Sequence, residues 1–111
     1  MLDIFVCEDN AAQRRTVVNI IQNTVLIEEL DMQLTLDTGD PYMLLEKVKT
    51  SQNTGIYFLD IDLNSNMNGM KLAQQIRLYD PRGFIIFITA HSELSYMTFQ
   101  YRVEAMDFVL K

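Results

Sequence analysis

Short apolar runs alternate along the chain with longer stretches in which apolar residues recur every three or four positions. The runs predict strands, and the stretches between them predict amphipathic helices. Five strands are expected, at Leu2 to Cys7, Met32 to Leu36, Ile56 to Asp62, Phe84 to Ile88 and Phe108 to Leu110. Helices are expected from Ala11 through Val25, Pro41 through Val48, Met70 to Leu78, and Ser92 or Ser95 through Tyr101.

This alternation favours one α/β domain with right-handed crossovers, a parallel sheet and helices on both sheet faces. The central run, I-Y-F-L-D-I-D from Ile56, is apolar at nearly every position and predicts a strand that is buried on both faces. Met32 to Leu36 instead alternates apolar and polar residues, which predicts an edge strand with one exposed face. Asn10 and Asp40 are suited to cap the first two helices.

Polar residues stand where the predicted strands end. Parallel strands all point in one direction, so the residues that follow them meet at one rim of the sheet, which is where open α/β sheets bind ligands. Four of the predicted strands deliver residues to this rim: Glu8 and Asp9, Asp60, Thr89, and Lys111.

Carboxylates that crowd together repel one another and remain ionised only around a cation. A set of oxygen ligands suits Mg²⁺, which is small, hard and retains several waters. A hydroxyl from Thr89 and an ammonium from Lys111 would complete a site for a phosphoryl group. Asp60 is then either the nucleophile that receives this group or a further metal ligand.

Composition narrows the classes of partner. The chain has 111 residues and a net charge of −6, which argues against a nucleic-acid surface on this segment. Its single cysteine, Cys7, cannot form an internal disulfide. The N-terminal residues lack the basic start of a signal peptide, and no apolar run approaches the length of a membrane span. We therefore expect a cytoplasmic protein without a membrane partner.

The chain resembles the receiver domain of two-component response regulators. The resemblance lies in the acidic pair after the first strand, Asp60 after the third, Thr89-Ala90 after the fourth and Lys111 after the fifth. The resemblance implies a flavodoxin-like (CheY-like), doubly wound sheet of five parallel strands in the order 2-1-3-4-5. It also implies that a sensor histidine kinase phosphorylates Asp60 in a Mg²⁺-dependent reaction. Such a domain is not an enzyme in the usual sense, because it catalyses only its own phosphotransfer and dephosphorylation.

The same resemblance assigns roles to individual residues. Glu8, Asp9, Asp60 and the backbone carbonyl of Asp62 would hold Mg²⁺. Thr89 and Lys111 would bind the phosphoryl group, and Phe108 would be the switch aromatic. His91 follows two residues after Thr89, and a surface position is the simplest interpretation of it.

The segments C-E-D-N, Y-F-L-D-I-D-L and A-M-D-F-V-L-K resemble one branch of these regulators more closely, the AgrA-type quorum-sensing regulators with a LytTR DNA-binding output. That implies control of transcription and a homodimer on phosphorylation. Leu63-Asn64 replaces the usual Met-Pro after the phosphoacceptor. Residues 1–111 are expected to form a receiver truncated after its fifth strand, without its last helix or its output domain. Because that helix would cover apolar surface beside the first helix, we expect its absence to promote self-association.

Two other functions fit parts of the pattern. Asp60-Ile61-Asp62 also resembles the D-x-D motif of haloacid-dehalogenase-like phosphohydrolases, in which Asp60 would be the nucleophile and Asp62 the general acid. That motif belongs near a first strand, whereas Glu8 and Asp9 precede it here. A receiver-like interaction module that never takes up phosphate is the third possibility, and the complete set of acids, threonine and lysine argues against it.

Overall fold

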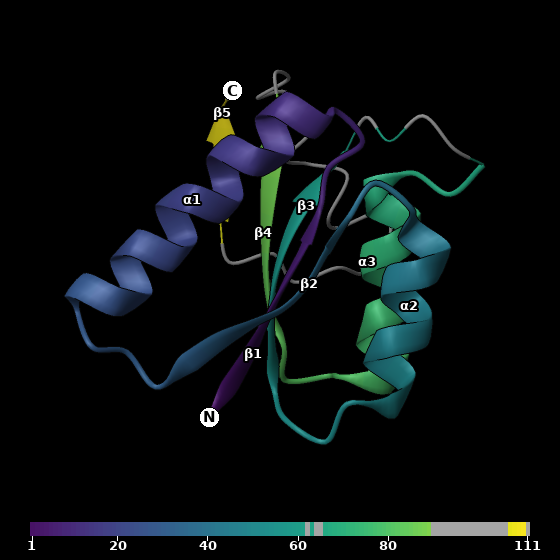
Figure 1. Ribbon diagram of the computed structural model, residues 1–111. Helices are drawn as coiled ribbons and strands as arrows, with labels where there is room; N and C mark the ends of the chain where they lie inside the picture. The colour runs from purple at the N-terminus through teal and green to yellow at the C-terminus, as the bar shows by residue number, and fades with distance from the viewer. Residues whose placement is uncertain (62, 64–65, 90–106, 111) are drawn as a thin grey trace.

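The computed structural model describes residues 1–61, 63, 66–89 and 107–110, with the backbone alone for residues 89 and 107–110. The strands are β1 (Leu2–Cys7), β2 (Met32–Thr38), β3 (Gly55–Asp60), β4 (Phe84–Thr89) and β5 (Asp107–Leu110). They form one parallel sheet in the order β2-β1-β3-β4-β5 (Figure 1). The predicted architecture, strand order and edge position of β2 are therefore confirmed.

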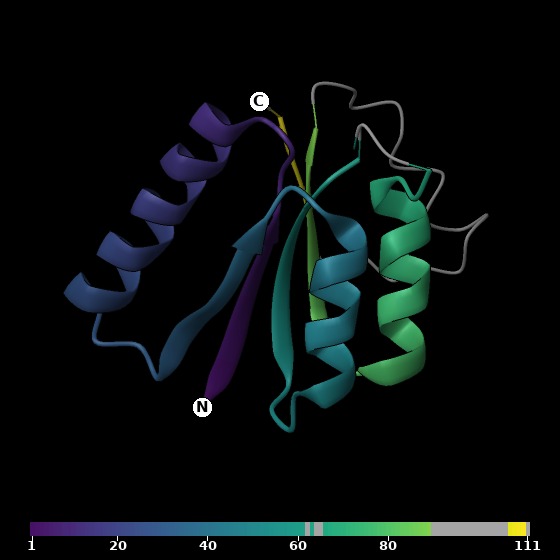
Figure 2. The ribbon, with the colours of Figure 1, turned by 45° about the vertical axis from the view of Figure 1, so that its right-hand side comes forward.

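The helices among the described residues are α1 (Ala11–Ile27), α2 (Pro41–Thr50) and α3 (Gly69–Tyr79). Figure 2 shows α1 on one face of the sheet, with α2 and α3 side by side on the other. The helix predicted from Ser92 or Ser95 through Tyr101 lies outside the described residues. No helix in the described ranges combines the length and the apolarity needed to span a membrane.

Each helix begins at a side chain that caps a free backbone N–H. Asn10 accepts a hydrogen bond from the N–H of Gln13 at 3.0 Å. Asp40 caps α2 in the same way, just before Pro41, and Asn68 caps α3. All three caps stand at the rim where strands end, so local sequence fixes where the chain turns from sheet to helix above the site.

The principal core lies between the sheet and the pair α2 and α3. Tyr57 and Leu59 of β3 point into it, and the rings of Phe5 and Tyr57 stack with centroids 5.0 Å apart. Helix α3 adds the apolar stripe that its sequence predicts: Met70, Leu72, Ala73 and Ile76. This core holds the ends of β1 and β3 in a fixed register, with Cys7 opposite Leu59.

The face under α1 is less completely covered by the described residues. Ile56 and Phe58 of β3 are only half-buried there, so the prediction of a central strand buried on both faces is wrong for these side chains. They line an apolar groove of about 490 Å³ between α1 and the sheet. Ile20 and Ile21 both belong to the apolar positions that recur at helical spacing in α1, but Ile20 is 61% exposed at this groove, whereas Ile21 is buried.

The strand boundaries differ most from the sequence pattern at the carboxyl ends of β3 and β2. β3 ends at Asp60 rather than Asp62, because its register with β4 stops at the pair Asp60 and Ile88. β2 continues beyond Leu36 to Thr38, which pairs with Cys7. The strand ends therefore stand level at one rim.

Candidate functional site

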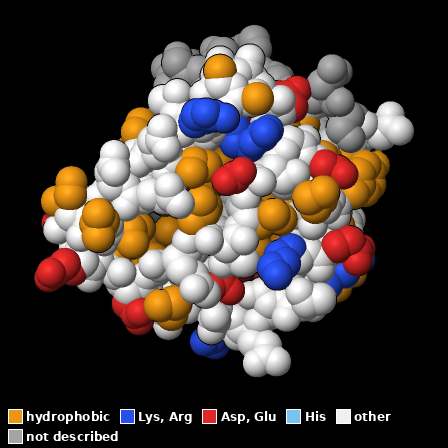
Figure 3. Space-filling model, viewed as in Figure 1, with side chains coloured by type: hydrophobic (Ala, Val, Ile, Leu, Met, Phe, Trp, Pro, Cys, Tyr) orange, Lys and Arg blue, Asp and Glu red, His pale blue; other side chains and the backbone are white. Residues whose placement is uncertain are grey.

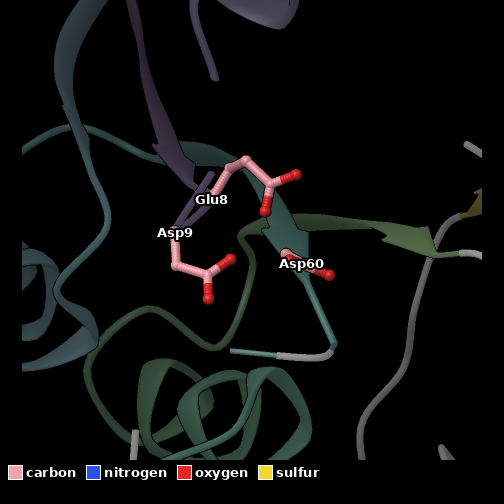
Figure 4. A group of neighbouring side chains, drawn as sticks. All are labelled: Glu8, Asp9 and Asp60. Atoms are coloured by element: carbon pink, nitrogen blue, oxygen red, sulfur yellow. The ribbon is translucent and has the colours of Figure 1, made fainter. Parts of the chain in front are cut away.

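Three carboxylates converge at the carboxyl ends of β1 and β3. Glu8 and Asp9 follow Cys7, and Asp60 follows Leu59, the residue paired with Cys7. Ligand oxygens of the three acids all lie within 4.8 Å of one another (Figure 4). Glu8 and Asp60 are each only 2% exposed, whereas Asp9 is exposed. The sheet register thus assembles the acid cluster that the sequence predicted at this rim.

The donor set fits a hard divalent cation. The cluster offers only carboxylate oxygens, from two buried acids and one at the surface. Burying like charges together is costly unless a cation compensates them. Mg²⁺ accepts oxygen ligands and retains waters on its open side, which matches a site with one solvent-facing ligand. Glu8, Asp9 and Asp60 are therefore the residues that could hold it.

The electrostatic effect of this cluster reaches its neighbour Cys7. Burial, followed by the negative charges of Asp40 and Asp60, raises the pKa of the Cys7 thiol from 9.0 to about 12. The thiol is fully buried and stays protonated near neutral pH. Cys7 is therefore an inert part of the core beneath the acids rather than a reactive nucleophile.

Gly69 determines how closely the start of α3 approaches Asp60. Its N–H donates to the carbonyl of Ile61 at 3.1 Å. A Cβ at this position would collide with the carbonyl oxygen of Asp60 and lie 2.7 Å from the Cα of Ile61. Only glycine fits this contact without a backbone shift. In the sequence, Asn68 and Gly69 are simply residues that suit a turn. A glycine directly after a helix cap is the signal that could have indicated this approach.

The other predicted site residues are described only in part. The backbone of Thr89 follows Ile88, which pairs with Asp60, so this strand also ends at the rim. The backbone of Phe108 pairs with Phe87. Asp62, His91 and Lys111, by contrast, lie outside the described residues, as do the side chains of Thr89 and Phe108. Their assigned roles remain predictions.

A family model for the response regulator receiver domain matches residues 4–111. The chain belongs to this family. Over 110 residues, this receiver domain is 56% identical to accessory gene regulator protein A of Staphylococcus epidermidis, a match that covers 99% of the chain and 46% of that protein. The receiver domain thus spans about half the length of the curated relatives that it matches.

Solved structures agree on the fold. The response regulatory domain of mrkE from Klebsiella pneumoniae has a TM-score of 0.79 and 25% sequence identity, covering 98% of this chain and 82% of that one. The response regulator TrrA from Thermotoga maritima, solved in complex with Mg²⁺ and BeF, has a TM-score of 0.77 and 20% identity, covering 100% and 87%. The family match and these structures make the chain a CheY-like receiver.

Proposed function

We propose that this receiver domain takes a phosphoryl group on Asp60 from a sensor histidine kinase, in a reaction that needs Mg²⁺. The observation that carries the proposal is the position of Asp60: it is buried at the end of β3, with oxygens of Glu8 and Asp9 within 4.8 Å. A buried carboxylate beside two other acids is suited to a metal-assisted phosphotransfer, because a bound cation removes the repulsion that an incoming phosphate would meet.

In the proposed reaction, a carboxylate oxygen of Asp60 attacks phosphorus while the bond from phosphorus to the kinase's histidine nitrogen breaks. The histidine carries a proton on its other ring nitrogen, so it keeps the electron pair of the broken bond and leaves as a neutral imidazole, and Asp60 carries an acyl phosphate. Glu8, Asp9, Asp60 and the carbonyl of Asp62 would hold Mg²⁺, which would neutralise charge on the phosphoryl oxygens.

The remaining roles complete this proposal. Thr89 and Lys111 would bind the phosphoryl oxygens, and Phe108 would respond to the movement of Thr89. Dephosphorylation would be catalysed by the domain itself. We propose further that the domain is a cytoplasmic switch that dimerises on phosphorylation and controls a LytTR-type transcriptional output in quorum sensing. The similarity to accessory gene regulator protein A supports the role in gene regulation. The phosphohydrolase is set aside, because Asp60 ends the third strand of a receiver rather than the first.

The test uses beryllofluoride, which stands in for the phosphoryl group on a carboxylate. We expect it to raise the melting temperature of the wild-type protein only when Mg²⁺ is also present. Asp60→Asn should abolish this response. Asp40→Asn is the matched control, because it makes the same chemical change after β2, which lies two strands away from β3 in the sheet, and Asn still caps α2. An unchanged response in Asp60→Asn, or none in the wild type, would overturn the proposal.

A further inference from the structure

Both peptide groups that flank the side chain of Glu8 are tied down from outside its own turn. The N–H of Glu8 donates to the carbonyl of Thr38 at 3.0 Å, which joins the turn to the end of β2. The Glu8 carbonyl accepts a hydrogen bond from Nη1 of Arg14 at 2.7 Å. The second bond is short and charge-assisted, the stronger class of hydrogen bond. The backbone that carries Glu8 into Asp9 is therefore clamped from two sides.

Arg14 is itself held in place from several sides. Its backbone N–H donates to the carbonyl of Asn10 at 2.8 Å in the first turn of α1. Its Nε lies 3.8 Å from a carboxylate oxygen of Asp37, and its side chain is 26% exposed. Basic side chains gather over the start of α1 in Figure 3. Arg14 therefore reaches from the helix across to the end of β2, with the Glu8 carbonyl between them.

Gly39 leaves the space that this arrangement needs. A Cβ at Gly39 would lie 3.2 Å from Nη1 of Arg14 and 3.2 Å from the Cα of Asp9. The guanidinium and the backbone of Asp9 thus pack against the same point of the loop after β2. Three segments meet here, and Arg14 is the side chain that links them.

We propose that Arg14 is a positioning residue of the acidic site. By holding the Glu8 carbonyl, it fixes the turn after β1 so that the carboxylates of Glu8 and Asp9 converge with Asp60 before a cation binds. This role rests on the proposed Mg²⁺ site. Preorganising ligands in this way lowers the ordering cost that binding would otherwise carry.

The charge of Arg14 makes the proposal sharply testable. A positive guanidinium near a cation site disfavours Mg²⁺ by simple repulsion. If Arg14 acted only through its charge, replacing it with an uncharged residue would tighten Mg²⁺ binding. If it positions the turn, the same replacement weakens binding. The direction of the change in the dissociation constant therefore separates the two effects.

The experiment is calorimetric titration of the folded protein with MgCl₂. For Arg14→Met, which keeps an extended side chain without charge or donors, we expect the dissociation constant to rise about tenfold, as for other residues that orient metal ligands. Arg14→Lys retains the charge but not the planar fork of donors, so it should bind with intermediate affinity. Arg15→Met is the matched control, because Arg15 is the exposed next residue and loses the same charge; its affinity should stay equal to the wild type or become slightly tighter.

Melting curves from circular dichroism establish that each variant is folded. If Arg14→Met does not fold, Arg14→Lys decides the matter, because its charge is unchanged and only the positioning differs. Wild-type binding together with equal or tighter binding in the Arg14 variants would overturn the positioning role and leave the proposed function intact. Failure of the wild-type protein to bind Mg²⁺ would overturn the metal site and the role of Arg14 together.

Discussion

Replacing Glu8 with glutamine removes one charge from a cluster whose ligand oxygens lie within 4.8 Å of one another. Glu8 and Asp60 are both 2% exposed, so little water separates their charges. Two unit charges 4.8 Å apart repel by about 3.5 kcal/mol at an effective dielectric constant of about 20. Solvent on the open side of the site screens part of this repulsion. We therefore expect Glu8→Gln to raise the free energy of unfolding in metal-free buffer by about 1–3 kcal/mol.

The same substitution should weaken the response to metal. At a Mg²⁺ concentration a hundred times its dissociation constant, binding stabilises a folded protein by about 2.7 kcal/mol. A tenfold weaker dissociation constant would reduce this gain to about 1.4 kcal/mol. Glu8→Gln is thus expected to be more stable than the wild type without metal and to gain less from metal.

Urea unfolding followed by far-ultraviolet circular dichroism, in EDTA and in Mg²⁺, measures both effects. Glu28→Gln is the control, because it makes the same chemical change at an exposed position at the far end of α1. Its unfolding free energy should stay within about 0.5 kcal/mol of the wild type in each buffer. A loss of stability in EDTA for Glu8→Gln, or an undiminished gain from Mg²⁺, would refute the reasoning from charge repulsion.

Of three further predictions, two concern the surroundings of the site and one concerns Asp3, at the opposite end of β1. Gly69→Ala should weaken Mg²⁺ binding and cost about 1–3 kcal/mol of unfolding free energy, because the new Cβ displaces the backbone at Ile61. An unchanged dissociation constant for Mg²⁺ in calorimetric titration would contradict this. Burial opposes ionisation of Asp3, but hydrogen bonds from neighbours such as Ser51 at 2.8 Å lower its pKa below 3.8. Asp3→Ala should therefore lose about 1–3 kcal/mol of unfolding free energy near neutral pH, and its unfolding free energy should differ less from that of the wild type as the pH falls below 3.8. The raised pKa of Cys7 predicts that the wild type loses unfolding free energy as the pH rises from 9 toward 12, a loss that Cys7→Ala should lack in urea titrations.

Much of this architecture follows from local sequence. Apolar runs and helix caps such as Asn10 and Asp40 determine where each element begins, and the parallel order brings Glu8 and Asp60 to one rim. These features depend on residues close together in the chain or on the general rule that parallel strands end at one side.

The details that sequence reasoning missed depend on contacts between distant segments. In the sequence, Arg14 is only one of several polar residues between the apolar positions of the first helix. Its bond to the Glu8 carbonyl and its approach to Asp37 depend on how α1 packs beside β2. The exposure of Ile20 was missed for a related reason. Helical spacing identifies an apolar stripe but does not show which part of it meets the sheet.

Intact mass spectrometry after incubation with acetyl phosphate and Mg²⁺ tests the central claim most directly. The wild-type protein should gain the mass of one phosphoryl group, whereas Asp60→Asn, or the wild type in EDTA, should gain none. Equal labelling of Asp60→Asn, or an unlabelled wild-type protein that is folded and binds Mg²⁺, would contradict the assignment of Asp60 as the phosphoacceptor.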